Sequence, residues 1–226
     1  MNVLLFGATG MIGRGVLLEC LADPTVTRVV SIVRRSTGVT DPKLHEVVHK
    51  DFTDYSTIEK ELGGLDACFF CLGVSSAGMS EADYTVITHD YTIAAAQVLK
   101  RLNPGLTFCF VSGASTDSTE KGRTMWARVK GKTENEIIAT FERGFAFRPG
   151  YIHPMKGVVS GTRLYRAFYV VLAPLYPALK RMFPSFVTTT VAIGRAMINA
   201  VSNPPAKHVL EVPDINELAE TVSNAA

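Results

Sequence analysis

A glycine-rich turn near the start of the chain could hold phosphate groups. It reads Gly7-Ala8-Thr9-Gly10-Met11-Ile12-Gly13, directly after an apolar run and before a helical pattern. In such a turn one glycine allows a tight bend, one lets backbone approach a pyrophosphate, and one lets helix and strand pack closely. The free amides and positive dipole end of the helix would face the phosphates. The spacing therefore predicts a dinucleotide site that includes Gly7, Thr9, Gly10, Met11, Ile12 and Gly13.

Two arginines, Arg34 and Arg35, follow the next apolar run. An NAD site usually has Asp or Glu about 20 residues after the glycines, where it holds the ribose 2′-hydroxyl. Here no acid occupies that place, and a guanidinium suits a 2′-phosphate through forked, charge-assisted hydrogen bonds. The pattern favours NADP(H) over NAD(H); the alternative is a solvated loop that carries surface charge.

Four cysteines occur, at positions 20, 68, 71 and 109. Cys68 and Cys71 have redox-motif spacing, but they lie in an apolar run typical of a strand, where residues three apart point to opposite faces. We therefore expect buried free thiols, a reducing compartment and a cytoplasmic location. No signal peptide or spanning helix is expected, and the five histidines form no metal-ligand spacing.

Alternating apolar and helical patterns must position these residues. Strands are predicted at 2–6, 28–33, 46–49, 66–72, 106–111, 145–148 and 207–211. Helices are predicted at 11–21, 55–62, 81–102, 124–141, 162–172, 176–182 and 191–201, with a last helix capped by Asp214 and Glu217. Strands that are apolar throughout and separated by helices indicate a parallel sheet covered on both faces. The fold class predicted is a doubly wound α/β sheet, a Rossmann fold.

The last third of the chain is rich in aromatic residues and proline. No linker or repeat separates it from the rest. We therefore expect one domain over residues 1–226, with residues 151–206 as a small helical cap on the substrate side.

An ordered set of short motifs resembles a known family. After the glycine turn and Arg34 come Asp51-Phe52, Cys71-Leu72-Gly73, Lys130-Gly131 with Glu134, and Arg148-Pro149-Gly150. Together they resemble the atypical short-chain dehydrogenases/reductases (SDRs), in particular the group of the HIV Tat-interacting protein and bacterial epimerase-like relatives. The resemblance covers nearly the whole chain.

The resemblance implies an adenosine side for the cofactor. Asp51 and Phe52 would hold the adenine edge, Asp51 by its side chain. Leu72, Gly73 and Val74 would line the cofactor near the riboses. A turn residue after a strand is the alternative interpretation of Asp51.

The resemblance also implies a nicotinamide side. Ser112 and Gly113 would flank the nicotinamide, and Lys130 would bind the hydroxyls of its ribose. Pro149, Gly150 and Tyr151 would pass beside the carboxamide. The alternative for Lys130 is a solvated charge on a helix.

The catalytic pattern of the family is broken. SDR chemistry uses Tyr-x-x-x-Lys, in which the lysine charge lowers the tyrosine pKa and the phenol exchanges a proton with substrate. Here Lys130 matches, but the position four residues earlier holds Trp126, whose indole only donates a hydrogen bond. Another group could supply the proton, hydride could move without a relay, or there could be no turnover.

Several residues remain candidates for the missing role. Ser112 and Ser115 could hydrogen-bond a substrate carbonyl, and Trp126 could stack over the pocket mouth. The proton donors considered are Tyr151, His153, Tyr84 and Tyr91. With Lys130, the serines form the predicted catalytic set, and Trp126 and His153 the predicted substrate pocket.

The favoured hypothesis is an NADP-dependent oxidoreductase or epimerase-like enzyme that acts on a small, rather apolar carbonyl or hydroxyl compound. The alternative is a catalytically silent NADP(H)-binding regulator with a protein partner. A net charge of +2 without any basic run argues against nucleic acid as a ligand. A homodimer is compatible with either hypothesis.

Overall fold

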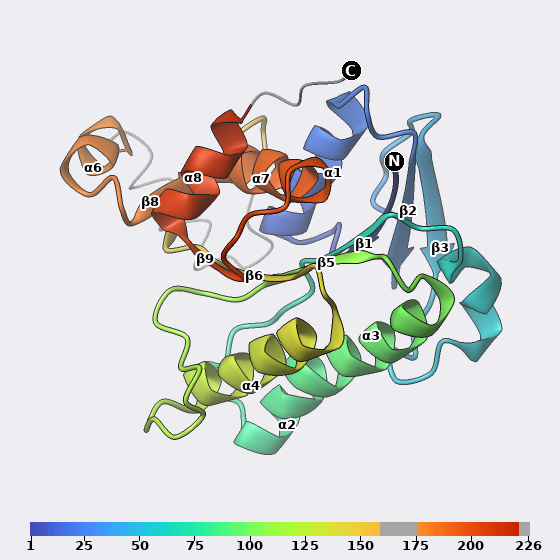
Figure 1. Cartoon of the computed structure of the whole chain (residues 1–226), viewed down its shortest axis with the longest axis horizontal. Helices are drawn as coiled ribbons and strands as arrows, with labels where there is room; N and C mark the ends of the chain where they lie inside the picture. The colour runs from blue at the N-terminus through green and yellow to red at the C-terminus, as the bar shows by residue number, and fades with distance from the viewer. Residues whose placement is uncertain (159–175, 222–226) are drawn as a thin grey trace.

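A parallel sheet forms the centre of the molecule (Figure 1). The computed structural model describes residues 1–158 and 176–221, and within them the sheet has seven strands in the order β3-β2-β1-β4-β5-β6-β9, each pair parallel. The strands are β1 Asn2–Phe6, β2 Arg28–Val33, β3 Leu44–Val48, β4 Ala67–Phe70, β5 Thr107–Val111, β6 Gly144–Arg148 and β9 Val209–Glu211. This order, which reverses between β1 and β4, is that of a Rossmann fold and confirms the predicted fold class.

Helices cover both faces of the sheet, as Figure 1 shows. One face carries α1 Met11–Ala22, α7 Thr190–Ser202 and α8 Val212–Glu220, and the other carries α3 Tyr91–Leu102 and α4 Met125–Thr140. Alternation along each strand divides the apolar residues between the two faces: Val3 and Leu5 join one core cluster, and Leu4 and Phe6 the other. Because β1 and β4 pair in parallel, their carboxyl ends lie side by side at one edge of the sheet.

Three predicted helices differ from the observed ones. The residues expected to form one helix at 81–102 form α2 Glu81–Thr85, a π-helical turn η2 Val86–Asp90, and α3. The segment at 55–62 is a 3₁₀-helix, η1 Ser56–Leu62. The last helix begins earlier than predicted: Asp214 Oδ2 accepts a hydrogen bond from the N–H of Glu211 at 3.0 Å, so Asp214 is the third helical residue, not the cap. Apolar spacing does not distinguish one helix type from another over a single turn.

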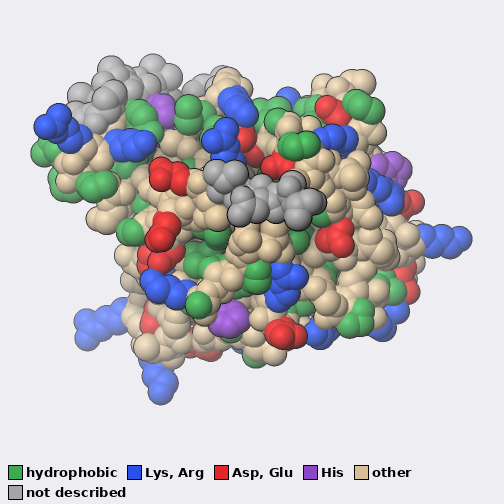
Figure 2. Space-filling model, turned by 45° about the horizontal axis from the view of Figure 1, so that its top comes forward, with side chains coloured by type: hydrophobic (Ala, Val, Ile, Leu, Met, Phe, Trp, Pro, Cys, Tyr) green, Lys and Arg blue, Asp and Glu red, His purple; other side chains and the backbone are tan. Residues whose placement is uncertain are grey.

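A short second sheet lies beyond the predicted pattern. Its parallel strands are β7 Tyr151–His153 and β8 Val187–Thr189. Three-residue strands give too little alternation to be recognised. Between them, α6 Tyr176–Met182 matches the predicted 176–182 helix, whereas the helix predicted at 162–172 lies outside the described residues. Figure 1 shows α6 at one end of the molecule, and Figure 2 shows basic and hydrophobic side chains together at that end. The last turn of α6 carries Lys180 and Arg181, and Met182 and Phe183 are exposed.

The C-terminal third packs closely against α1. A Cβ atom at Gly15 would lie 2.5 Å from Cβ of Thr190, and one at Gly194 would lie 2.7 Å from Cγ of Glu19. Glu19 is buried, and its carboxylate accepts from Lys156 Nζ at 2.5 Å and from Arg195 Nε at 3.2 Å. The first helix is therefore held by residues that lie far along the chain.

Candidate dinucleotide site

The glycine turn has the geometry that the sequence predicts. Gly7 has φ 81°, and a Cβ atom there would lie 2.6 Å from the carbonyl oxygen of Cys71, just after β4. A Cβ atom at Gly13 would lie 2.1 Å from the oxygen of Gly7. Neither position accepts a side chain without a shift of the backbone, so the turn remains narrow and bare.

The first turn of α1 presents free amides. Gly10 is the N-cap and provides no side-chain cap, and the first turn has no acidic residue. The N–H of Gly10 donates to Gly7 O at 2.9 Å, and the first bond within the helix runs from the N–H of Arg14 to Gly10 O at 2.8 Å. The amides of Met11, Ile12 and Gly13 precede that bond and have no acceptor within the helix. Bare amides at the positive end of a dipole fit a pyrophosphate.

Positive side chains surround a pocket beside this turn. The pocket has a volume of about 470 Å³. Its lining residues are Ala8, Thr9, Arg14, Leu18, Arg35, Ser36, Thr37, Lys156, Gly157 and Val158. Three cations thus come from α1, from the segment after β2 and from the segment after β7. We call this the cationic pocket.

The cationic pocket contains only part of the predicted set, and it adds two cationic residues that were not predicted. Arg35 lines it, whereas Arg34 is exposed and not among the lining residues. Arg14, whose Nη1 donates to Thr37 O at 3.2 Å, and Lys156 were not predicted. The position of Arg14, directly after the third glycine, could have indicated it. Lys156 has no local signal, because only the path of the chain after β7 brings it to α1.

Asp51 and Phe52 follow β3 but differ in environment. Asp51 is exposed, and its Oδ1 accepts from the hydroxyl of Thr53 at 2.6 Å and from its N–H at 2.9 Å, which lowers the pKa of Asp51. Phe52 is buried and stacks on Tyr91, with ring centroids 5.7 Å apart. The side chain of Phe52 thus belongs to the core, and only its backbone is available to an adenine.

The segment after β4 continues the same edge of the sheet. Cys71 lies against Gly7, Leu72 packs on the core, and Gly73 and Val74 are exposed. Burial is the main cause that raises the pKa of the Cys71 thiol far above its ordinary value, and the neighbouring Cys109 is a second, smaller cause. A reactive thiolate is therefore not expected at Cys71.

Lys130 lies beneath the carboxyl end of β5. Its Nζ donates to Val111 O and to Ser112 O, each at 3.2 Å, and lies 5.5 Å from the centre of the Phe110 ring. Burial lowers the pKa of Lys130 to about 8, while the charge of Glu134 opposes that shift. The predicted lysine and the predicted serine are thus brought together.

A chain of hydroxyl groups fixes the proton of Ser112. Thr116 Oγ1 lies 2.8 Å from Gly113 O and 2.8 Å from Ser112 Oγ. A carbonyl only accepts, so Thr116 donates to Gly113 and accepts from Ser112. In this arrangement Ser112 Oγ is left with lone pairs for any further partner, and its role as a donor to a substrate carbonyl stays a prediction. Ser115 is exposed, with φ 69°.

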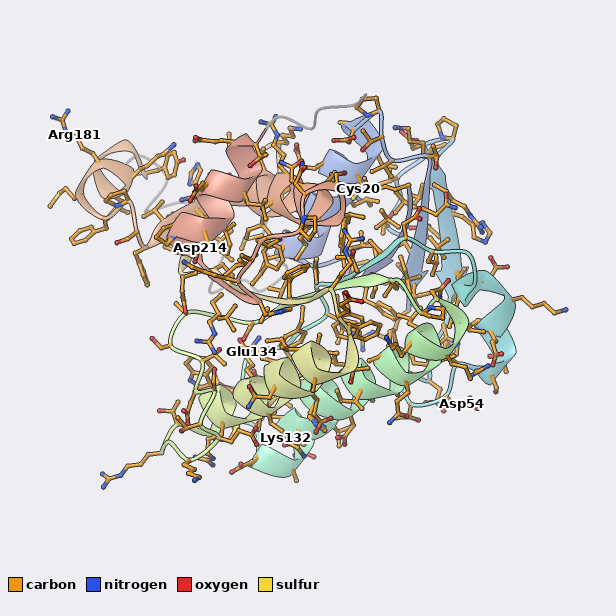
Figure 3. All side chains as sticks on the ribbon, in the orientation of Figure 1. Cys20, Asp54, Lys132, Glu134, Arg181 and Asp214 are labelled. Carbon is orange, nitrogen blue, oxygen red and sulfur yellow. The ribbon has the colours of Figure 1, made fainter. Side chains whose placement is uncertain are left out.

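Trp126 lies at the same edge. Its ring comes within 4.0 Å of the place that a Cβ atom would take at Gly113. The helix that holds Trp126 and Lys130 is tied to β6, because Glu134 is fully buried and its Oε2 accepts from Arg148 Nη2 at 2.5 Å. Figure 3 shows Glu134 on the side of α4 that faces the sheet.

The segment after β6 turns toward the second sheet. Gly150 passes so close to Phe186 that a Cβ atom would lie 2.5 Å from its carbonyl oxygen. Tyr151 begins β7, and the ring of His153 stacks on Tyr176 at 3.9 Å. Burial lowers the pKa of His153 and raises that of Tyr151.

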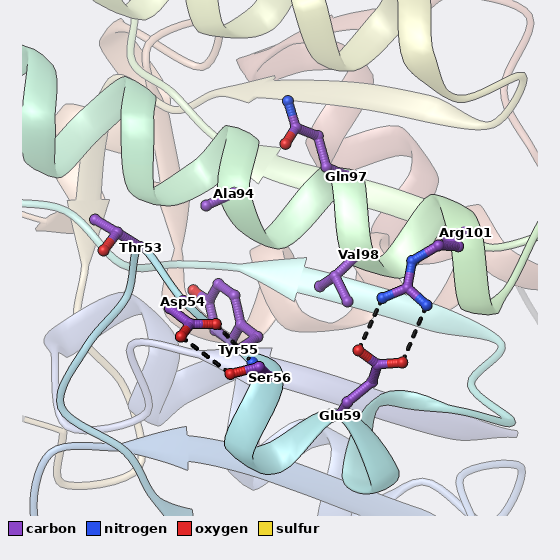
Figure 4. A pocket seen from close by; sticks show the side chains of 9 residues that line it. All are labelled: Thr53, Asp54, Tyr55, Ser56, Glu59, Ala94, Gln97, Val98 and Arg101. Carbon is purple, nitrogen blue, oxygen red and sulfur yellow. Dashed lines mark hydrogen bonds and ion pairs between the residues drawn. The ribbon is translucent and has the colours of Figure 1, made fainter.

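The other tyrosines considered as proton donors serve packing. Tyr84 is 1% exposed, and Tyr91 stacks on Phe52. Figure 4 shows a different pocket, of about 480 Å³, between η1 and α3, where Arg101 and Glu59 form two hydrogen bonds. That pocket contains none of the predicted site residues.

Residues 7–138, more than half of the chain, match the model of the NAD(P)H-binding family. The match begins at the first glycine of the turn. The chain belongs to the NAD(P)H-binding family. A nicotinamide dinucleotide is therefore the class of cofactor, and the geometry of the turn fits its phosphates.

This chain resembles fungal proteins along most of its length. It is 29% identical over 235 residues to the mitochondrial protein FMP52 of Chaetomium globosum, covering 96% of this chain and 97% of that one. It is 27% identical over 208 residues to fmp52 of Emericella nidulans, covering 88% and 86%. A structure of UDP-glucuronic acid 4-epimerase from Bacillus cereus with NAD has a TM-score of 0.66 at 15% identity, covering 93% and 76%. This last likeness shows the fold.

The relatives correct one expectation. They are named as mitochondrial proteins, which contradicts the cytoplasmic location expected from the sequence. Free cysteines indicate a reducing environment but do not identify a compartment, and this is why the inference was wrong. None of the described helices has the length and apolarity needed to span a bilayer.

Proposed function

We propose that the protein is an NADP(H)-dependent oxidoreductase or epimerase-like enzyme that acts on a small, rather apolar carbonyl or hydroxyl compound. One observation carries this proposal: a bare glycine turn and uncapped helix N-terminus lie beside a pocket with three cations. A helix N-terminus accounts for the pyrophosphate, and guanidinium groups account for an additional 2′-phosphate.

In this proposal the cofactor runs along the carboxyl edge of the sheet. Arg14 and Arg35 would hold the 2′-phosphate, next to Lys156, whose Nζ also pairs with Glu19. Lys130 would lie beside the nicotinamide ribose. The remaining contacts are those of the sequence prediction: Gly7, Thr9, Gly10, Met11, Ile12, Gly13, Arg34, Asp51, Phe52, Leu72, Gly73, Val74, Ser112, Gly113, Pro149, Gly150 and Tyr151. Residues 151–206 would cap the substrate side of a single domain, with Trp126 and His153 in its pocket.

The alternative function is a catalytically silent NADP(H)-binding regulator. Trp126 favours it, since an indole cannot replace the phenol of an SDR. The lowered pKa of Lys130 favours an enzyme, because acid–base catalysis is most efficient when the pKa lies near the working pH.

Calorimetry with NADPH and NADH tests the cofactor preference. Arg14→Ala and Arg35→Ala should each lower NADPH affinity about 10- to 100-fold, the value of a charge-assisted hydrogen bond, and leave NADH affinity unchanged. Arg181→Ala, at an exposed arginine on α6, is the matched control. An equal loss for both dinucleotides would reject NADP as the cofactor.

Turnover distinguishes the enzyme from the regulator. Carbonyl compounds of increasing apolar size should be screened for oxidation of NADPH, followed by absorbance. Binding of NADPH without turnover across the whole screen would favour the regulator.

A further inference from the structure

The candidate site has a lysine but lacks the usual proton donor near it. Trp126 lies one turn before Lys130 on α4, and its indole does not exchange a proton at ordinary pH. Ser112, whose backbone carbonyl accepts from the lysine, directs the proton of its hydroxyl to Thr116. A group other than these must provide a proton to substrate oxygen.

Lys130 has no carboxylate partner among the residues that the structure describes. Glu134, one turn further along α4, is the nearest acid, but both of its oxygens are held by Arg148: Nε lies 3.0 Å from Oε1 and Nη2 lies 2.5 Å from Oε2. The ammonium of Lys130 is stabilised instead by the dipoles of two backbone carbonyls and by the face of Phe110. Such contacts hold the group in place without fixing its charge.

The two carbonyls leave one position of the nitrogen unused. A charged amine has three N–H groups, and two of them donate to Val111 O and Ser112 O. A neutral amine has two N–H groups and one lone pair. Both forms therefore satisfy the same two carbonyls, and the third N–H and the lone pair occupy the same direction. The proton can leave or return without any rearrangement of the side chain.

We propose that Lys130 is itself the acid–base group of this site and exchanges a proton directly with the substrate oxygen. This inference rests on the oxidoreductase function proposed above. A reduced nicotinamide, when bound, would supply the hydride to the carbonyl carbon. As the carbon–oxygen π bond breaks, the oxygen takes one proton from the ammonium of Lys130. The products are an alcohol, a neutral lysine and the oxidised dinucleotide, and bulk water returns the proton to Lys130.

The charged groups around Lys130 favour this role. Glu134 on α4, whose charge acts against the effect of burial on Lys130, is itself paired with Arg148 on β6. Burial then dominates and lowers the pKa of Lys130 to about 8. Carbonyl reduction should therefore lose rate as pH rises through about 8, and alcohol oxidation should gain it.

Proton release on binding tests the proposal without turnover. The ring of NADP⁺ is positive and that of NADPH is neutral, so NADP⁺ should lower the pKa of Lys130 further. If that shift is about one unit, about 0.5 proton is released at pH 7.5. Calorimetry in buffers of different ionisation enthalpy measures this number. The 2′-phosphate is common to both ligands, so its own proton cancels in the difference.

Two variants complete the calorimetric test. Lys130→Arg keeps the charge and the donors but cannot lose its proton, so the difference in release should disappear. Lys132→Gln, on the outer side of α4 in Figure 3, should retain it. Release that persists in Lys130→Arg would overturn the proposal.

A titration of the unliganded wild type gives an independent reading. With lysine labelled at 13Cε, one resonance should titrate near pH 8 and be missing from Lys130→Arg. A Lys130 resonance that titrates above pH 10 would overturn the proposal, as would a Lys130→Arg variant with more than one tenth of the wild-type turnover. Absence of dinucleotide binding would instead reject the proposed function, so the two failures are distinguishable.

Discussion

The two ends of the candidate site use positive charge in different ways. In the cationic pocket, Arg14, Arg35 and Lys156 reach one volume from three segments and remain in contact with solvent, although Lys156 also pairs with Glu19. At the other end, Lys130 is held beneath β5 by carbonyls, with no carboxylate of its own among the described residues. Solvated cations keep their charge, whereas a desolvated amine can lose it. The first arrangement suits binding of an anion, and the second suits exchange of a proton.

The largest effect should come from the turn that both ends share. In Gly13→Ala the new methyl group would meet Gly7 O at 2.1 Å, so the turn must open. We expect a fall in NADPH affinity of at least about 100-fold and a loss of up to about 3 kcal/mol in unfolding free energy. Calorimetry and chemical denaturation measure these. Gly105→Ala is the control, because a Cβ atom there would face open space. Normal NADPH binding by Gly13→Ala would contradict a phosphate site at the glycine turn.

A smaller effect should come from Lys130, the buried cation, through the pH dependence of stability. The pKa of Lys130 is lowered from 10.5 to about 8 by burial. Between pH 8 and pH 10.5, Lys130 has lost its proton in the folded state but still holds it in the unfolded state. The free energy of unfolding therefore rises with pH in this range, because the folded protein no longer buries a charged amine. Wild type should gain about 2 kcal/mol relative to Lys130→Met between pH 7.5 and 9.5 in urea denaturation. Parallel pH dependence of the two proteins would contradict the lowered pKa.

Salt should separate the two ends further. Ions screen solvated charges strongly and buried ones little. Raising NaCl from about 0.05 to 0.5 M should weaken NADPH binding about 10-fold, and the Lys130 titration should move by less than about half a unit. Fluorescence titration and NMR record the two quantities. A salt dependence of the Lys130 titration as strong as that of NADPH binding would contradict the difference in solvation between the two ends of the site.

The smallest effect should come from the hydroxyl chain. Thr116→Val removes the acceptor of Ser112 and the donor to Gly113 O, and should cost about 1 kcal/mol of unfolding free energy. Thr116→Ser keeps both bonds and should cost less. Equal losses in the two variants would show that packing of the methyl group, not the hydroxyl, is what matters.

Sequence patterns predicted what depends on local chemistry. The strands at the centre of the sheet and the glycine turn follow from apolar runs and from the needs of a tight backbone. Lys156 and Thr116 could not be predicted, because their roles depend on where a distant segment passes or on a single hydroxyl contact. The short strands β7 and β8 and the π-helical turn at Val86–Asp90 fall below the length at which periodicity is informative.

Glu19 limits how the chain can be divided. Its buried carboxylate has two cationic partners, Lys156 and Arg195, and both lie beyond the range that matches the NAD(P)H-binding family. A fragment that stopped near residue 138 would lack α7, whose Gly194 packs on Glu19, and would expose the apolar residues of α1 that α7 covers. The dinucleotide half is therefore expected to depend on the C-terminal segment for its folding, and expression of the matched range by itself should yield an unstable product.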